Sequence, residues 1–317
     1  MFKKSLVLIA AVVLIAAMFA GCGMGGNDVR INETSDTPFD SVSITTSSTR
    51  VVFAASDRYG VDIVVPERFA PEWYVADGRL TIRDKTNNYS IGWNVFPRNY
   101  YIKVYYPAGT NFADIAILSA SGRVEIPQLN VAYLNVASAS GRINAGVESF
   151  EFVSLSAASG DITFSGSGGS AVIVTQSGTV RADMGDCEAM SVETASGRIS
   201  LTGSGDTATM LSVSTMSGRV DAKGGAWQDA TVRTSSGNTT ISGEMLGDTY
   251  VETSSGSVQI SVNGSPSAYG YSLTPSSGSI RWNGERMARP ALSSGAFDNH
   301  ITVTTASGGI RVDFANR

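Results

Sequence analysis

The sequence predicts an all-β protein: a single-chain parallel β-solenoid of about ten or more coils of about 19 residues each, with an irregular N-terminal capping section. Three observations predict this class. A Ser-Gly pair recurs at nearly constant spacing, apolar residues two apart flank each pair, and no helix-length apolar stripe follows the first twenty residues. Right-handed coiling follows from the general preference of parallel crossover connections.

The Ser-Gly pairs mark the corners of the predicted coils. Their spacings are 19, 19, 18, 19, 21, 19, 19, 22 and 30 residues, as in "LNVASASGRINA" and "TVRTSSGNTTI". Antiparallel hairpins do not require a fixed period with identical corners, whereas identical bends stacked in line do. The structural corner glycines are Gly122, Gly141, Gly160, Gly178, Gly197, Gly218, Gly237, Gly256, Gly278 and Gly308.

The residues around each corner alternate between apolar and polar. In the coil of Gly141, the apolar positions are Val136, Ile143 and Ala145, and the other coils follow the same register. We expect the glycine to adopt a positive φ at the bend. We also expect the Ser before it, and the Thr or Ser three residues before it, to point inward. There their hydroxyls would form hydrogen bonds between coils.

The flanking segments depart from this regularity. The pattern begins at residues 41–53 with Thr49 in place of glycine, and "YVADGRLTI" reads as a further coil with Gly78 at its corner. We expect residues 39–112 to form divergent coils that cap the open end, and residues 113–317 to form the regular coils. The 30-residue gap, with "NGERMARPALSSGAFDN", is expected to be a loop near the far end.

A third, looser side of each coil is expected to bury the position nine residues after the glycine. Cys187 stands there, so we expect a small core residue rather than a reactive thiol or half of a disulfide. The other apolar residues at this position are Val131, Phe150, Trp227 and Leu246.

The N-terminus resembles a bacterial lipoprotein signal. Lys3 and Lys4 precede an apolar run that ends in "FAGC", so residues 1–21 would be a signal peptide and Cys22 the lipidated residue. Residues 22–38 would then be the lipidated cysteine and a flexible tether. The expected location is the extracytoplasmic side of a bacterial membrane, held by the lipid. A plain secretory peptide or an uncleaved anchor remains the alternative.

The charge pattern suggests one candidate binding surface. The chain has 23 basic and 28 acidic residues, a net charge of −5, which argues against a nucleic-acid partner. Nevertheless, a broken stripe of arginines follows the corners, and it is either a solvated face or a groove for anionic glycan, teichoic or lipid phosphates. Its members are Arg123, Arg142, Arg198 and Arg219, directly after corner glycines, and Arg181.

No cofactor and no metal ion are expected. Asp183, Asp186 and Glu188 lie in one bend, but they lack the regular spacing of a calcium loop. His300 is the only histidine, which leaves a histidine-based metal site or a Ser-His-Asp triad without support.

The corners "SASGRV", "TASGRI", "TSSGSV" and "TASGGI" resemble those of a widespread bacterial family known as "putative adhesin", a domain of unknown function built from β-strand repeats. The segments "YYIKVYYPAGTNFADIAILSASGRVEI" and "YVADGRLTIR" also match, and the resemblance covers roughly residues 40–317. It implies a cell-surface β-solenoid that is often attached to a membrane. It transfers no catalytic residues.

The resulting hypothesis is a non-enzymatic, lipid-anchored surface protein that serves in adhesion, interaction or as an envelope scaffold. Its partners would be the membrane, through Cys22, and an envelope polysaccharide or a protein. Two alternatives stay open: a carbohydrate-active enzyme on a β-helix, and an accessory protein of envelope-stress signalling.

Overall fold

The computed structural model describes residues 28–84, 100–206 and 208–315. They form two compact units, one ending at Ile162 and the other beginning at Thr163. The predicted all-β class is confirmed, because the described residues form strands with two short 3₁₀ turns, η1 (Glu67–Phe69) and η2 (Pro266–Ala268), and no α-helix.

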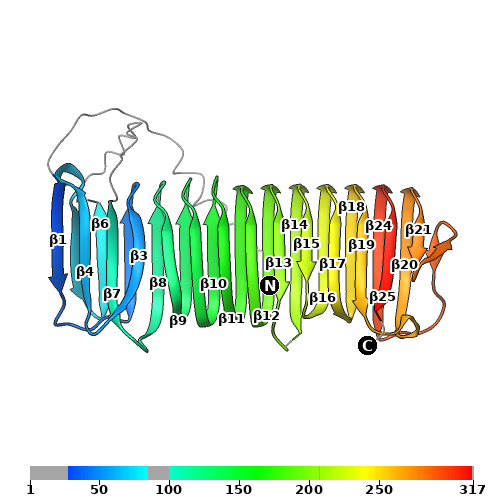
Figure 1. Ribbon diagram of the computed structural model, residues 1–317, viewed down its shortest axis with the longest axis horizontal. Helices are drawn as coiled ribbons and strands as arrows, with labels where there is room; N and C mark the ends of the chain where they lie inside the picture. The colour runs from blue at the N-terminus through cyan, green and yellow to red at the C-terminus, as the bar shows by residue number, and fades with distance from the viewer. Residues whose placement is uncertain (1–27, 85–99, 207, 316–317) are drawn as a thin grey trace. The chain divides into compact units, whose positions relative to one another are not determined.

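The first unit is built on two strand faces that share a core. On one face β2 pairs in parallel with β6 and β8, and β8, β9 and β10 continue the parallel order, lying side by side in Figure 1. On the other face β3 pairs in parallel with β7 and with the start of β9. Its strands are β1 (Asp28–Thr34), β2 (Ser41–Thr46), β3 (Arg50–Ser56), β4 (Gly60–Pro66), β5 (Pro71–Ala76), β6 (Arg79–Asp84), β7 (Tyr101–Pro107), β8 (Asn111–Ser119), β9 (Val124–Ser138) and β10 (Ile143–Ala157).

Antiparallel strands complete both faces of the first unit. β4 pairs antiparallel with β7 and with β1, while β5 pairs antiparallel with β6. The expectation of a coil with its corner at Gly78 is therefore wrong. Asp77 and Gly78, with φ of 52° and 71°, form the two-residue turn of a hairpin, for which Asp-Gly is a preferred sequence.

The second unit repeats one arrangement from β12 onward. The strands before the corners pair in parallel in the order β12–β14–β16–β18, and the strands after the corners in the order β12–β13–β15–β17–β19. Its strands are β11 (Ile162–Ser177, beginning at the boundary residue), β12 (Val180–Ser196), β13 (Ile199–Gly203), β14 (Thr209–Ser217), β15 (Val220–Lys223), β16 (Ala226–Ser236), β17 (Thr239–Leu246), β18 (Asp248–Ser255), β19 (Val258–Asn263), β20 (Tyr269–Ser277), β21 (Ile280–Trp282), β22 (Glu285–Met287), β23 (Ala291–Leu292), β24 (Asn299–Ser307) and β25 (Ile310–Ala315).

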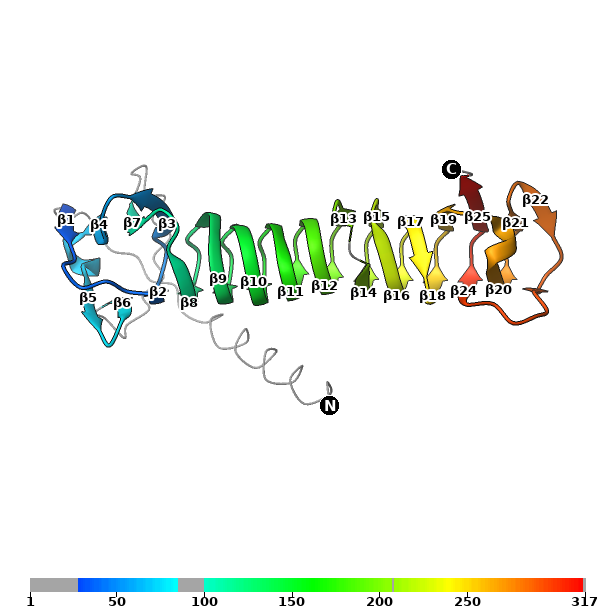
Figure 2. The same ribbon diagram turned by 90° about the horizontal axis from the view of Figure 1, so that it is seen from below.

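The last repeats of the second unit are not in sequence order. β18 and β19 pair with β24 and β25, and these in turn pair with β20 and β21. The C-terminal repeat, red in Figure 2, thus lies between the yellow repeat of β18 and the orange repeat of β20. Residues 283–298, expected to be a loop, instead contribute β22 and β23, which pair antiparallel with β21 and β20.

The predicted core positions are confirmed. Every residue five before and every residue two after a corner glycine is buried, as Val136 and Ile143 illustrate with exposures of 0%. On the third side, Val131, Phe150, Cys187 and Trp227 are buried as expected. Leu246 is only half-buried, and its neighbour Met245 takes the core position instead.

The corner glycines are required by the contact between repeats. A Cβ on Gly141 would lie 2.0 Å from the carbonyl oxygen of Gly122, and one on Gly218 would lie 1.8 Å from that of Gly197. The expected positive φ occurs at only some corners, for example Gly237 at 148°. The close approach of the neighbouring backbone is therefore the more general cause. Thr49 is tolerated because it is the first corner among the described residues, and its carbonyl oxygen faces Gly122.

The prediction for the corner hydroxyls is half right. Thr194, Thr215 and the equivalent residues are buried, but the Ser before each glycine is exposed, because the bend interrupts the inward and outward alternation. The expected hydrogen bonds between repeats are wrong for most of the threonines, whose hydroxyls have no partner among the described residues: Thr46, Thr194, Thr215, Thr234 and Thr253. Ser119 and Ser138 instead accept the N–H of the corner glycine of their own repeat, at 2.9 and 2.8 Å.

Candidate functional site

The five arginines of the predicted stripe all lie on exposed positions after the corners, but they fall into two groups. Arg123 and Arg142 belong to the first unit, and Arg181, Arg198 and Arg219 to the second. The stripe is therefore described as two separate sets.

The arginines of the first unit have acidic partners. Arg123 Nη1 lies 3.4 Å from a carboxylate oxygen of Glu125, and Arg142 Nη2 lies 3.5 Å from one of Asp161. Their side chains are about half exposed, at 52% and 54%, so these pairs are solvated and contribute little to stability. Glu125 also pairs with Arg50, so Arg142 has an acidic partner of its own whereas Arg123 shares its partner with a second arginine.

The arginines of the second unit lie in three neighbouring repeats. Arg198 and Arg219 occupy the same position of adjacent repeats, since Ile199 pairs with Val220 and the Ile199 N–H donates to the Arg219 carbonyl at 2.9 Å. Arg181 faces the same side in the preceding repeat, opposite Ser200, which stands two residues after Arg198. Within the residues that the structure describes, none of the three guanidinium groups has a carboxylate within ion-pair distance.

We call Arg181, Arg198 and Arg219 the arginine group. Arg198 and Arg219 are in register and Arg181 lies beside them, so three exposed guanidinium groups offer N–H donors that suit phosphate, sulfate or carboxylate oxygens. Asp221, opposite Ser200, and Asp183, further along the strand of Arg181, limit its positive field. The arrangement can bind an anion.

The acidic bend was a candidate calcium loop. Asp183, Asp186 and Glu188 are exposed, and no group of three metal-binding side chains occurs in the described part of the chain. His300, the single histidine, lies with Nδ1 3.3 Å from the Thr302 hydroxyl oxygen.

Cys187 is buried, as expected of a core residue. Its Sγ donates a hydrogen bond to the Gly166 carbonyl at 3.4 Å, and burial raises the pKa of the thiol to about 11. Because the thiolate is the reactive form, this environment makes the thiol a poor nucleophile.

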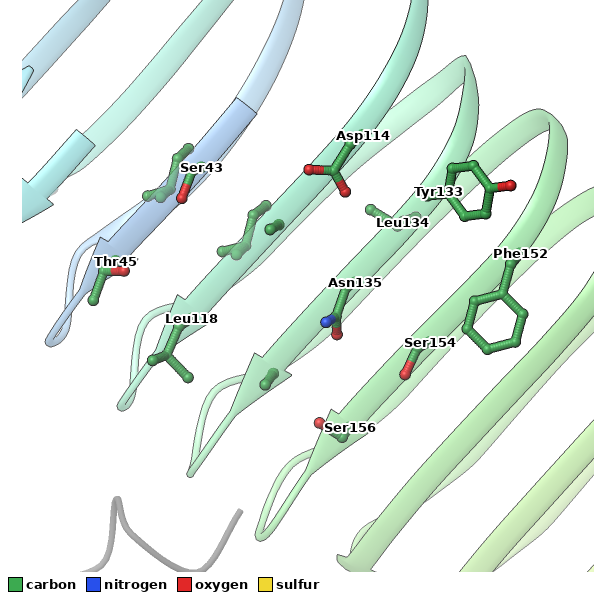
Figure 3. A pocket seen from close by; sticks show the side chains of 14 residues that line it. Ser43, Thr45, Asp114, Leu118, Tyr133, Leu134, Asn135, Phe152, Ser154 and Ser156 are labelled. Carbon is green, nitrogen blue, oxygen red and sulfur yellow. The ribbon is translucent and has the colours of Figure 1, made fainter. Parts of the chain in front are cut away.

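Sequence reasoning missed a second candidate surface, in the first unit. A hollow of about 620 Å³ lies on the outer face of β2, β8, β9 and β10, and Figure 3 shows Leu118, Tyr133, Asn135 and Phe152 around it. The signal was present, since Tyr133 and Phe152 stand at an outward-facing position eight residues before their corner glycines. Large rings at two successive outward positions are unusual for a solvated face.

Cys22 and the preceding apolar run lie outside the described residues. Within those described, the chain has no helix of the length and apolar character that a membrane crossing requires.

Several solved structures of bacterial proteins match the chain at low sequence identity. It is similar to a "putative adhesin" from Bacteroides fragilis (10% identity, 92% of this chain and 100% of that one, TM-score 0.38). It is also similar to a "putative lipid binding protein" from Parabacteroides distasonis (13% identity, 91% and 97%, TM-score 0.40). A third is a "putative adhesin" from Parabacteroides merdae (15% identity, 76% and 99%, TM-score 0.36). No curated protein sequence matches significantly.

The family of the chain is identified by a match over its repeats. The family model for Toastrack DUF4097 matches residues 39–209 and 169–313, which together include every corner described above. The chain belongs to the Toastrack DUF4097 family.

Proposed function

We propose that this protein is a non-enzymatic binding scaffold, exported and held at the membrane by a lipid on Cys22, whose arginine group binds an anionic envelope polymer. The observation that carries the proposal is the register of Arg198 and Arg219, exposed in adjacent repeats without a carboxylate partner among the described residues. Like charges at this spacing repel one another, and an anionic chain would relieve the repulsion.

We further infer that the repeats of each unit are coils of a parallel β-solenoid, right-handed as parallel crossovers generally are. Parallel pairing in register supports this inference. Such a solenoid repeats one outward position every coil, so it can present identical side chains in a row to a polymer with repeating charges. The antiparallel strands β1, β4 and β5 would serve as its N-terminal cap.

The arginine group is tested with labelled polyphosphate and detergent-solubilised full-length protein in a fluorescence-polarisation assay. We expect R181Q/R198Q/R219Q to bind about tenfold more weakly or worse, because three guanidinium donors are lost. The matched control is R123Q/R142Q, which removes the same kind of side chain from ion pairs and should change binding by about twofold at most. Equal losses in both variants would contradict the assignment.

The anchor and the non-enzymatic role have their own tests. Replacing Cys22 by Ser should abolish incorporation of labelled palmitate and release the protein from the membrane fraction. Incubation with envelope polysaccharide should produce no new reducing ends. Cleavage of the polysaccharide by the purified protein would overturn the non-enzymatic proposal.

A further inference from the structure

The hollow on the first unit differs in chemistry from the arginine group. Its floor is formed by small residues, since Ala116 of β8 and Ala137 of β9 face outward there. Three large side chains rise around them: Leu118 is 42% exposed, Tyr133 51% and Phe152 37%.

The pairing of the strands brings the two rings together. Tyr133 of β9 and Phe152 of β10 are register partners, so their side chains leave the same face on neighbouring strands about 4.8 Å apart. Figure 3 shows both rings at the same side of the hollow. They form a short aromatic platform that is open to solvent.

Polar side chains occupy the next row of the same face. Ser43, Asn135 and Ser154 lie in register across β2, β9 and β10, with Ala116 between the first two. Hydroxyl and amide groups both donate and accept hydrogen bonds, so this row can match ligand hydroxyls in either orientation.

The charges at the hollow disfavour an anionic ligand. Asp114 lies beside the platform, and its carboxylate accepts a hydrogen bond from Arg79 Nη1 at 2.9 Å. Glu151 accepts a hydrogen bond from the Tyr133 hydroxyl, which raises the pKa of Tyr133. Asp114, which is paired with Arg79, is the one charged residue among those that line the hollow, so the lining suits a ligand without charge.

We propose that this hollow binds a neutral polysaccharide chain. The apolar C–H faces of the sugar rings stack on Tyr133 and Phe152, while the sugar hydroxyls form hydrogen bonds with Asn135 and the neighbouring serines. The inference rests on the proposed role as a binding scaffold but not on the arginine group.

The test is affinity electrophoresis of the detergent-solubilised full-length protein in gels that contain hydroxyethylcellulose, glucomannan or soluble starch. We expect at least one of these neutral polymers to retard the protein, and Y133A/F152A to weaken its binding by about tenfold or more. Tyr74→Ala is the matched control, because Tyr74 is equally exposed at 51% but lies on β5, which β6 separates from β2, and does not line the hollow. It should bind as the unchanged protein does.

Three results would overturn the proposal. The first is that none of the three polymers retards the protein. The second is that Y133A/F152A is retarded as much as the unchanged protein while its melting temperature is unchanged. The third is that Y133A/F152A changes the sedimentation of the protein, which would identify the face as a self-association surface. Polyphosphate binding by the same preparations separates the two proposals. If it persists while neutral-polymer binding is absent, only the hollow is wrongly assigned. If neither polymer binds, the binding scaffold itself is contradicted.

Discussion

Replacing Gly141 by Ala tests the physical reason for the repeated corner. The added Cβ would lie 2.0 Å from the Gly122 carbonyl oxygen, so the two repeats must separate by about 1 Å to reach an allowed contact. Three hydrogen bonds between repeats flank this point: Ala139 N to Ser119 O at 3.1 Å, Ser140 N to Ala120 O at 2.8 Å, and Val124 N to Arg142 O at 2.9 Å.

A separation of this size weakens all three bonds. At about 1 kcal/mol net for each, the expected loss in the free energy of unfolding is about 3 kcal/mol. Gly109→Ala is the control, because Gly109 has a φ of 81° and a Cβ added there would meet no atom within 4 Å. The free energy of unfolding of Gly109→Ala should fall by only about 1 kcal/mol, which is the cost of holding alanine in the left-handed conformation.

Urea unfolding, followed by circular dichroism, measures both variants. We expect the midpoint of Gly141→Ala to fall well below that of Gly109→Ala, at a similar slope. If Gly141→Ala loses no more stability than Gly109→Ala, close stacking of the corners is not what requires glycine there.

Three further predictions concern single side chains. Burial raises the pKa of Asp84 despite two hydrogen bonds from Ser47. The folded state therefore holds the Asp84 proton more tightly than the unfolded state does. The stability that this proton contributes falls as pH rises from about 4 through the raised pKa. Asp84→Asn should therefore match or exceed the unchanged protein in melting temperature at pH 7 and lose that pH dependence. Cys187, with a pKa of about 11, should resist iodoacetamide at pH 8 until urea unfolds the chain, as peptide mass spectrometry would show. Trp227→Ala should lower the unfolding free energy by about 4 kcal/mol in urea titrations, because a fully buried ring and its hydrogen bond to the Ser242 carbonyl are lost.

Each of these has a contradicting outcome. A melting temperature of Asp84→Asn that stays below that of the unchanged protein from pH 4 to pH 7 would mean that the carboxylate stabilises the fold. Rapid alkylation of folded protein at Cys187 would place the thiol at the surface. A loss near 1 kcal/mol for Trp227→Ala would show that the third side of the repeat is loosely packed.

The repeat was predictable because its physical cause is local and recurs. A Ser-Gly corner flanked by apolar residues two apart specifies a bend and two half-buried strands, and the buried positions, such as Val136 and Ile143, follow from parity. The Ser before the glycine was misplaced because a bend breaks that parity. The hairpin at Asp77 and Gly78 carried a recognisable turn signal that the solenoid pattern concealed.

The order of the last repeats could not be predicted. "TPSSGSI" and "TTASGGI" present the same corner, and either can form the same backbone ladder against the repeat of Gly256. The choice of the C-terminal repeat as that neighbour depends on where residues 283–298 lead the chain, which no local pattern specifies.

The arginine group was partly predictable. The sequence placed the five arginines on one exposed stripe, and it also places Glu125 two residues after Arg123, but the ion pair of Arg142 depends on a neighbour in space. The carboxylate of Asp161, for example, reaches Arg142 from the next repeat, nineteen residues away. Hence the stripe could be drawn from the sequence, whereas its division into compensated and uncompensated charges required the structure.

Disulfide cross-linking tests the central claim, in-register parallel stacking with the C-terminal repeat inserted between its predecessors. In a Cys187→Ala background, cysteines at Glu252 and Thr304 would occupy register partners on exposed faces, at a separation that a disulfide can bridge. Cysteines at Glu252 and Thr274 would lie two repeats apart, beyond that reach. We predict that the 252–304 pair forms a disulfide under mild oxidation and the 252–274 pair does not. The reverse result would contradict the stacking order.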